Sequence, residues 1–297
     1  MAEKYEIKEY TIKEEPFYLP QSNEIDFFEM CFNNKIPIAL IGPTGCGKTR
    51  LVEHMAWRLG KKLAAVEKKK QDEGKEDSTR PFVTISCHED LSANDLIGRY
   101  ILKGQEGVWQ DGPLLTAVKH GGICYLDEVV EARKDTAVVL HSLSDYRRTI
   151  SVEKLGEIYE AHPDFFLVIS WNPNYQNISK NLKQSTRQRF ETLKLGYPSS
   201  ELETKIVAKE SGVEEKMAKC IVEIGGKIRN LKGKGLDEGA STRLLVYAGQ
   251  LIKAGAEPKA VLENIVNSIS DDIHDDTYSS IKKGINEVIE NYLPRKK

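Results

Sequence analysis

The segment that most constrains the fold of this chain is a glycine-rich loop between an apolar run and an amphipathic stretch. The run 37–41 is typical of a buried β-strand, and apolar residues recur at helical spacing over 51–59. The residues between them have the pattern of a phosphate-binding loop: Gly42, Pro43, Thr44, Gly45, Cys46, Gly47, Lys48 and Thr49. The sequence therefore predicts a strand, a phosphate-binding loop and a helix in direct succession.

Each residue type in this loop has its own chemical role. The glycines let consecutive backbone N–H groups point at phosphate oxygens, and the following helix adds its positive N-terminal end. Lys48 would reach the outer phosphates, and the Thr49 hydroxyl would bind a magnesium ion that bridges them. Arg50, the next residue, is also predicted to bind nucleotide. A chance glycine turn is the alternative, and the loop by itself does not separate kinases, GTPases and motors.

Composition limits the classes of function. The 297 residues include 43 basic and 45 acidic ones, and the net charge of −2 gives no field that favours nucleic acid or an anionic membrane. No apolar run approaches the roughly 20 residues needed to span a bilayer. Residues 1–10 are charged rather than signal-like, so we expect a cytoplasmic protein. The five cysteines are scattered without a CxxC pair, which predicts reduced packing residues and neither disulfides nor a zinc site.

Strand and helix patterns alternate through the first two thirds of the chain. A helix is predicted at 24–32, and the helix after the loop is predicted to end near Gly60. Further strands are predicted at 81–86, 123–126, 165–169 and 192–195. This order predicts an α/β fold, an αβα sandwich with a five-stranded parallel sheet.

Other segments depart from this alternation. The charge run 67–77 predicts a solvated, mobile loop. Segments 100–109 and 149–160 predict two β-hairpins inserted into the fold. From 199 onward only helical spacing remains, including an amphipathic pattern at 278–289. We therefore predict a charged leader over 1–21, a nucleotide-binding core over 22–198 and an all-helical domain over 199–297.

An acidic pair, Asp127 and Glu128, follows the apolar run 123–126. In a phosphoryl-transfer site, Asp127 would orient the magnesium shell and Glu128 would polarise the attacking water. Such a pair could instead cap the next helix, but beside a phosphate-binding loop the catalytic interpretation is favoured. Asn172 follows the run 165–170 at the sheet edge where ligands bind, and could hold the water or sense the γ-phosphate. An ordinary Asn-Pro turn is its alternative.

Three arginines are further candidates. Arg187 and Arg189 lie just before the last predicted strand, and an arginine from a neighbouring subunit can stabilise a transferring phosphoryl group. Two solvated surface arginines are the alternative. Arg243 opens a helix of the C-terminal domain, where a cation next to the positive helix end is unfavourable unless an anion binds there. We therefore expect Arg243 at the cleft between the domains, in contact with nucleotide.

Taken in this order, the phosphate loop, the acidic pair, Asn172, Arg189 and Arg243 resemble those of an AAA+ ATPase. The two hairpins resemble the inserts of its MoxR branch. More specific segments, spread over 15–252, are similar to the CbbQ/NirQ/NorQ group: 42–49, 86–91, 95–100, 109–114, 184–190 and 239–243.

The resemblance implies an ATP- and Mg²⁺-dependent ATPase that forms a ring, usually hexameric, with the helical domain as a lid. It implies work with a partner carrying a von Willebrand factor A domain, and activation or maturation of a target enzyme. Rubisco is the target in the CbbQ type and nitric oxide reductase in the NirQ/NorQ type. The resemblance also implies that residues 98–100 and the following hairpin face the pore or the partner, although Tyr100 and Trp109 could equally be packing anchors.

Two other functions are open to such a chain. A nucleotide-gated scaffold would bind ATP for structure and would need no residue to activate water. The intact Asp127–Glu128 pair therefore argues against a scaffold. A nucleic-acid motor would share the core. No zinc finger, helix-turn-helix module or large basic face is evident to support that function.

Overall fold

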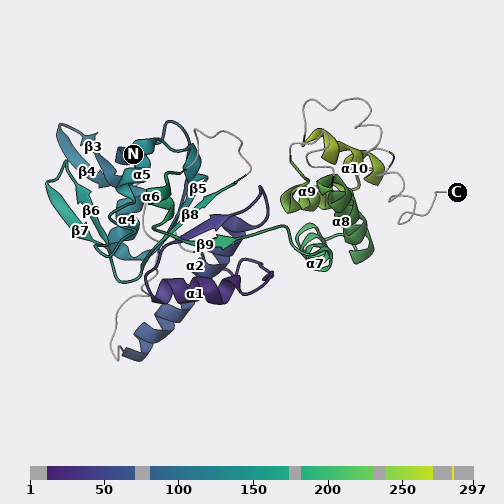
Figure 1. Ribbon diagram of the computed structural model, residues 1–297, viewed down its shortest axis with the longest axis horizontal. Coiled ribbons are helices and arrows are strands. Elements are labelled where there is room, and N and C mark those ends of the chain that lie inside the picture. Colours follow the sequence, from purple (N-terminus) through teal and green to yellow (C-terminus); the bar gives the residue numbers. More distant parts are fainter. Residues whose placement is uncertain (1–11, 71–80, 174–181, 231–237, 270–282, 284–297) are drawn as a thin grey trace. The chain divides into compact units, whose positions relative to one another are not determined.

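The computed structural model describes residues 12–70, 81–173, 182–230, 238–269 and 283, and all structural statements below concern these residues. They form two compact units (Figure 1). The first unit comprises Met1–Gly42 and Lys48–Leu195, and the second comprises Pro43–Gly47 and Gly196–Lys297. The tip of the glycine-rich loop therefore belongs with the helical part of the chain. The predicted functional boundaries at 21/22 and 198/199 stay predictions.

A five-stranded sheet forms the centre of the first unit. Its strands lie in the order β2-β5-β8-β1-β9, and every pairing is parallel. Their bounds are Phe82–Ser86 for β2, Gly122–Asp127 for β5, Phe165–Trp171 for β8, Ile38–Ile41 for β1 and Glu191–Lys194 for β9. The predicted five-stranded parallel sheet is confirmed. Because β1 and β5 both border β8, the carboxyl ends of these three strands meet at one edge.

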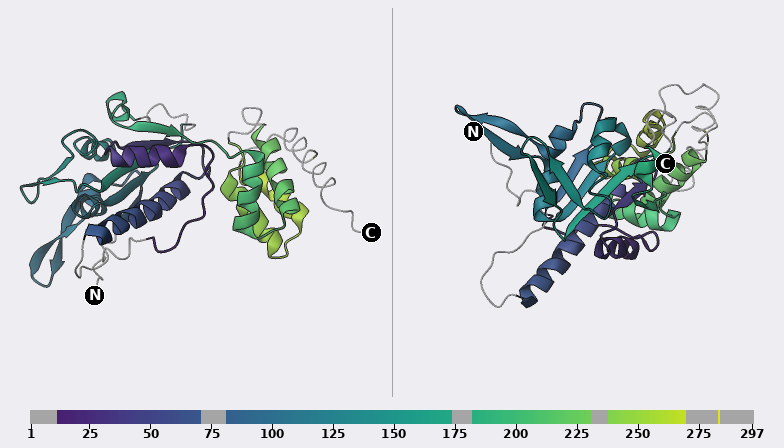
Figure 2. Two further views of the ribbon diagram at one scale, coloured as in Figure 1. Left: turned by 90° about the horizontal axis from the view of Figure 1, so that it is seen from below. Right: turned by 60° about the vertical axis from the view of Figure 1, so that its left-hand side comes forward.

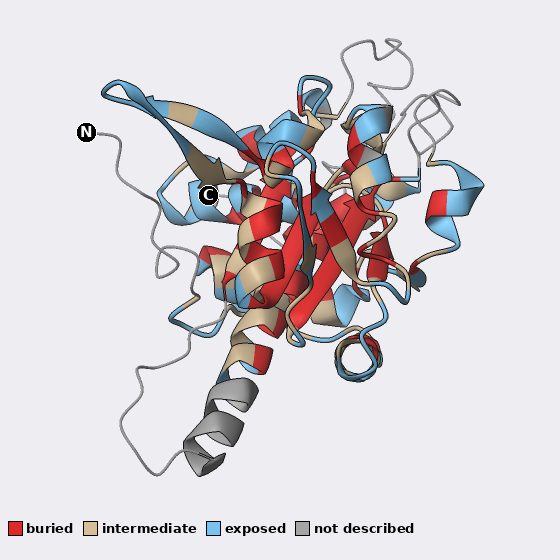
Figure 3. Cartoon of the chain, turned by 90° about the vertical axis from the view of Figure 1, so that its left-hand side faces the viewer, coloured by how far each residue is buried: buried red, intermediate tan, exposed pale blue. Residues whose placement is uncertain are grey.

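The central strands are buried on both faces, as Figure 3 shows for the sheet. Successive side chains of a strand point to opposite faces. Accordingly Cys124 and Leu126 join a large apolar cluster on one face, whereas Tyr125 lies outside that cluster. This double burial explains why β1, β5 and β8 appear in the sequence as continuous apolar runs and not as alternating ones.

Helix α1 (Glu24–Asn33) covers one face of the sheet, where Phe28 and Phe32 both make edge contacts with the Phe166 ring. Helix α2 (Lys48–Lys70) contacts α1 and lies beside it in Figure 2. The prediction that α2 ends near Gly60 is wrong, because the helix continues through Gly60 to Lys70. Strong helix formers after Gly60 outweigh the roughly 1 kcal/mol that glycine costs inside a helix. The predicted loop 67–77 is thus helical over 67–70, and its remainder lies outside the described residues.

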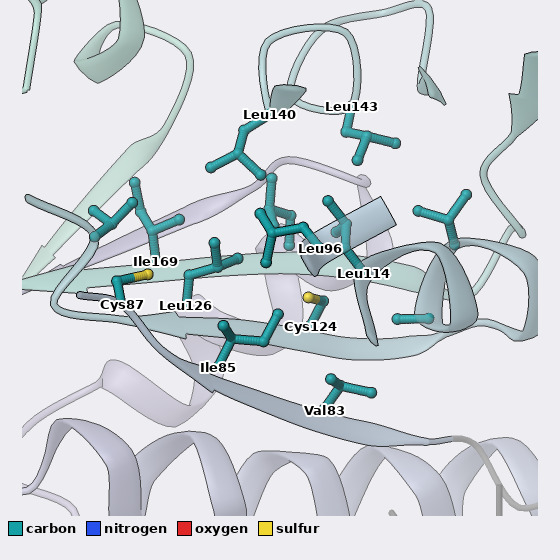
Figure 4. Close-up of a cluster of buried hydrophobic side chains, with 14 of the residues drawn as sticks. Val83, Ile85, Cys87, Leu96, Leu114, Cys124, Leu126, Leu140, Leu143 and Ile169 are labelled. Carbon is teal, nitrogen blue, oxygen red and sulfur yellow. The ribbon is translucent and has the colours of Figure 1, made fainter. Parts of the chain in front are cut away.

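The opposite face of the sheet is covered by short helices. They are α3 (Ala93–Ile97), α4 (Pro113–His120), the 3₁₀ turn η2 (Val129–Glu131), α5 (Lys134–Val139) and α6 (Gln184–Arg187). Leu96 of α3 and Leu114 of α4 pack with sheet residues such as Ile85 and Leu126 (Figure 4). Cys87 and Cys124 lie in the same cluster, and all five cysteines are buried, which agrees with the prediction that they are packing residues.

Both predicted hairpins are confirmed. Strands β3 (Gly98–Lys103) and β4 (Glu106–Asp111) form one antiparallel pair, and β6 (Thr149–Val152) and β7 (Glu157–Glu160) form the other. The rings of Tyr100 and Trp109 meet edge to face, with centroids 5.3 Å apart. Trp109 also packs on the core cluster and donates to Asp111 Oδ1 at 2.7 Å, so it anchors the hairpin, while Tyr100 is 53% exposed.

The second unit is helical, with α7 (Ser200–Ser211), α8 (Glu215–Arg229), α9 (Thr242–Lys253) and α10 (Pro258–Asn267) around their own apolar core. A largely buried ion pair joins α7 to α8. Arg229 donates two hydrogen bonds to the Glu203 carboxylate, at 2.7 and 2.6 Å, and Thr242 donates a third at 2.5 Å. These three hydrogen bonds offset the free-energy cost of burying the Glu203 carboxylate, which is only 1% exposed. The helical pattern predicted at 278–289 lies largely outside the described residues.

Candidate functional site

The glycine-rich loop leaves β1 and enters α2 through backbone conformations that favour glycine. Gly45 has φ +64° and Gly47 has φ +103°, both in the left-handed region. A Cβ atom on Gly45 would also approach the Cβ of Ser241 to 2.7 Å, closer than carbon atoms normally pack. Within the same unit, Tyr197 donates to the Thr44 carbonyl oxygen at 3.3 Å. The loop tip is therefore shaped by its own backbone and by contacts with the residues that begin α9.

Lys48 begins α2 and is nearly buried, with only 6% exposed. Its Nζ donates to the Gly42 carbonyl oxygen at 2.9 Å, which folds the side chain back along the loop. The same nitrogen lies 3.9 Å from Glu128 Oε1. The loop cation and the acidic pair predicted from the sequence are thus brought together. Arg50 instead is exposed and pairs with Glu53 at 3.3 Å on the outer surface of α2.

Lys48→Ala is expected to weaken ATP binding by about 10–100-fold, because a charge-assisted hydrogen bond to phosphate contributes about 1.5–3 kcal/mol. Titration with a fluorescent ATP analogue measures this change. Lys154→Ala is the matched control, since that lysine is exposed in the turn between β6 and β7. Unchanged affinity in Lys48→Ala would contradict a role of this lysine in nucleotide binding.

Asp127 is the last residue of β5, and its two carboxylate oxygens have different surroundings. Oδ2 faces α2 and accepts from the Thr49 hydroxyl at 3.4 Å. Oδ1 accepts from Ser170 at 2.5 Å and from Tyr125 at 2.8 Å. The two predicted metal-binding residues therefore offer oxygen atoms to the same space, which is the donor type that Mg²⁺ prefers.

Glu128 follows with left-handed backbone angles, φ 53° and ψ 49°, which are uncommon for a residue with a Cβ atom. Its backbone N–H donates to Ser170 Oγ at 3.3 Å, and its Oε2 accepts from the backbone N–H of Asn172 at 3.3 Å. Burial, together with the neighbouring Asp127 charge, raises the pKa of Glu128, while Lys48 opposes the rise. The alternative of a side-chain helix cap is not seen, because Glu128 makes no such bond to η2.

Asn172 lies directly after β8 and is 2% exposed, so it stands at the carboxyl edge of the sheet beside Glu128. The predicted arginines lie at the end of α6, just after it, and on α9. Arg187 is exposed at the end of α6, and Arg189 is half-buried, with Nη1 donating to the Ser185 carbonyl oxygen at 2.9 Å. Arg189 Nε is buried without a hydrogen-bond partner among the described residues. Arg243 is exposed in the first turn of α9, in the unit that holds the loop tip.

Sequence reasoning missed two residues of this site, Tyr125 and Ser170. Both are fully buried, and the Tyr125 hydroxyl lies 3.0 Å from Ser170 Oγ and 3.5 Å from Thr49 Oγ1. Burial, and then the Asp127 charge, raises the pKa of Tyr125, so the phenol stays protonated. A signal was present: a tyrosine and a serine are polar exceptions within two otherwise apolar strands.

Together, a parallel sheet, a phosphate loop with a buried lysine after β1 and an acidic pair at the end of β5 define a P-loop nucleotide-binding protein. Residues 37–190 match the AAA domain family (dynein-related subfamily), and residues 203–291 match the CbbQ/NirQ/NorQ C-terminal family. The chain belongs to the AAA domain proteins and, within them, to the CbbQ/NirQ/NorQ group. AAA+ membership implies nucleotide binding and ATPase activity.

Individual relatives agree with this assignment. The chain is 50% identical to Protein CbbQ of Hydrogenophilus thermoluteolus over 89% of its own length and 92% of that protein. It is 49% identical to Protein NorQ of Paracoccus denitrificans, over 92% of each chain. The crystal structure of NtrX from Brucella abortus has a TM-score of 0.53 at 14% identity, covering 93% of this chain and 60% of that one, and shows likeness of fold alone. No helix in the described residues is long and apolar enough to cross a membrane.

Proposed function

We propose that this chain is an ATP-hydrolysing remodelling protein of the MoxR branch that activates or matures a target enzyme. The observation that carries the proposal is the convergence of Lys48, Thr49, Asp127 and Glu128 at one edge of the sheet. A protein that only bound nucleotide would need the lysine and the loop. Hydrolysis also needs a carboxylate that can accept a proton from water. Glu128 meets this need, because its side chain bonds the Asn172 backbone and lies 3.9 Å from Lys48 Nζ.

In this function, Glu128 accepts a proton from the attacking water, and Asn172 helps to hold that water. Lys48 binds the outer phosphate oxygens. Thr49 and Asp127 would hold Mg²⁺, which neutralises charge on the phosphates when bound. The donor set fits this ion, because Mg²⁺ takes one or two carboxylates and keeps several waters. Among the described residues, no three or more His, Cys, Asp and Glu side chains are grouped so that they could hold a metal ion by themselves.

The remaining parts of the proposal concern assembly. A ring, hexameric as is typical of the family, would let Arg189 of one subunit act on nucleotide bound by the next. Arg189 is only half-buried and its Nη1 bonds a backbone carbonyl oxygen, which supports contact of the guanidinium with a group outside the chain itself. The partner would carry a von Willebrand factor A domain. The target would be Rubisco or nitric oxide reductase, as the resemblance to the CbbQ/NirQ/NorQ group implies.

Affinity purification of the tagged chain from its native organism, in ATP and then in ADP, tests this proposal. We expect a von Willebrand factor A domain protein and one target enzyme to be retained, and the activity of that enzyme to rise only when ATP is hydrolysed. Recovery of neither protein in either nucleotide would contradict the partner and target assignments. A nucleic-acid motor would instead show ATP hydrolysis stimulated by DNA.

A further inference from the structure

Tyr125 and Ser170 lie beneath the acidic pair because of the register of β5 and β8. Tyr125 pairs with Val168, so two residues further along each strand Asp127 lies beside Ser170 on the same face. This is the face covered by α1 and α2, since Phe166 of β8 contacts α1 and Tyr125 reaches Thr49 of α2. Three hydroxyl groups from β5, β8 and α2 therefore meet around a single carboxylate.

The hydrogen bonds around Asp127 divide its two oxygens. Oδ1 accepts from both buried hydroxyls, Tyr125 at 2.8 Å and Ser170 at 2.5 Å, whereas Oδ2 is left toward Thr49. The terminal torsion of an aspartate is broad, so packing alone does not orient the carboxylate. Two donors fixed on neighbouring strands do orient it, because rotation would leave buried hydroxyls unsatisfied.

Ser170 has a second contact that Tyr125 lacks. Its single proton goes to Asp127, and its oxygen accepts the backbone N–H of Glu128 at 3.3 Å. That N–H belongs to the residue with left-handed backbone angles, so the bond holds a conformation that a residue with a Cβ atom seldom adopts. One serine on β8 thus positions both members of the acidic pair on β5.

We propose that Tyr125 and Ser170 are positioning residues of the nucleotide site, Tyr125 by orienting Asp127 for metal binding and Ser170 by fixing Asp127 and Glu128 together. The inference rests on the proposed function, since it concerns the metal and water positions of an ATPase. It predicts that the two residues affect metal binding and turnover differently, which general packing defects would not do. Loss of the Tyr125 hydroxyl should weaken metal binding alone, and loss of the Ser170 hydroxyl should weaken both metal binding and turnover.

The test uses Mn²⁺ as the probe, added to the full chain with ADP, with free Mn²⁺ measured by its electron paramagnetic resonance signal. Tyr125→Phe is expected to raise the Mn²⁺ dissociation constant about 10-fold, as is usual when a hydrogen-bond partner of a metal ligand is removed. ADP affinity in EDTA should stay within about 2-fold of wild type, because the phosphate loop is unaltered. Tyr247→Phe is the matched control, since that tyrosine is 53% exposed on α9.

Ser170→Ala should weaken Mn²⁺ binding similarly and also lower kcat at saturating Mg²⁺, and Ser170→Thr should restore both because it keeps the hydroxyl. In an Asp127→Asn background, Tyr125→Phe should cause no further loss of Mn²⁺ affinity. Equal losses from Tyr125→Phe with and without Asp127→Asn, or an unchanged Mn²⁺ dissociation constant in Tyr125→Phe, would overturn the inference while the wild type still hydrolyses ATP. A wild type that binds neither ADP nor Mn²⁺ would overturn the proposed function as well.

Discussion

Glu128→Gln is expected to lower the ATP hydrolysis rate by about 10²–10⁴-fold, which is the usual contribution of a general base. Glutamine has nearly the same shape and can still accept from the Asn172 N–H, but it cannot take a proton from water. ATP binding should therefore persist or tighten slightly, since Lys48 stays in place and the charge facing the phosphates is removed. Single-turnover hydrolysis and equilibrium binding of the same protein measure the two effects separately.

The matched control for this variant is Glu131→Gln, which neutralises a carboxylate three residues further on, in η2. Its hydrolysis rate should stay near that of wild type. Comparable losses in Glu128→Gln and Glu131→Gln would mean that net charge near the site matters and not a positioned base. If Glu128→Gln lost hydrolysis but activated the target enzyme fully, the chain would be a nucleotide-gated scaffold with incidental turnover.

Arg189→Ala is expected to lower kcat by about 10³-fold or more, as loss of an arginine that stabilises a transferring phosphoryl group does. Nucleotide affinity should change little, because under this proposal the phosphate loop and Lys48 that bind the same nucleotide lie on the neighbouring subunit. Arg187→Ala is the matched control, since Arg187 is the exposed arginine two residues earlier and ends α6. A larger loss in Arg187→Ala would assign the trans-acting role to that residue instead.

Mixed rings test whether Arg189 acts across a subunit boundary. Glu128→Gln subunits carry an intact Arg189, and Arg189→Ala subunits carry an intact Glu128, so neighbours in a mixed ring would rebuild complete sites. Hydrolysis by the mixture should exceed that of either pure variant. No recovery after verified mixing, or a rate per subunit that is constant down to monomer, would contradict action in trans.

The fold was largely predictable because its signals are local. The buried strands are continuous apolar runs, and both hairpins have alternating strands around a glycine turn, so these elements were found close to their true bounds. The predicted end of α2 was wrong for an equally local reason. Gly60 and the charge run suggested a stop, although helix propensity on both sides favours continuation. The boundaries of the functional domains and the site assignments stay predictions.

The sequence by itself determined the family and predicted the chemistry of the site: the phosphate loop, the acidic pair and Asn172 are residue types whose order along the chain is typical of an AAA+ ATPase. Only the tertiary structure decided which atoms meet. The register of β5 against β8 sets Ser170 beside Asp127, and the packing of α2 brings Thr49 to Tyr125. These contacts join residues 43 and 76 positions apart. Local periodicity carries no information on pairing at that separation, because register depends on which buried faces fit together.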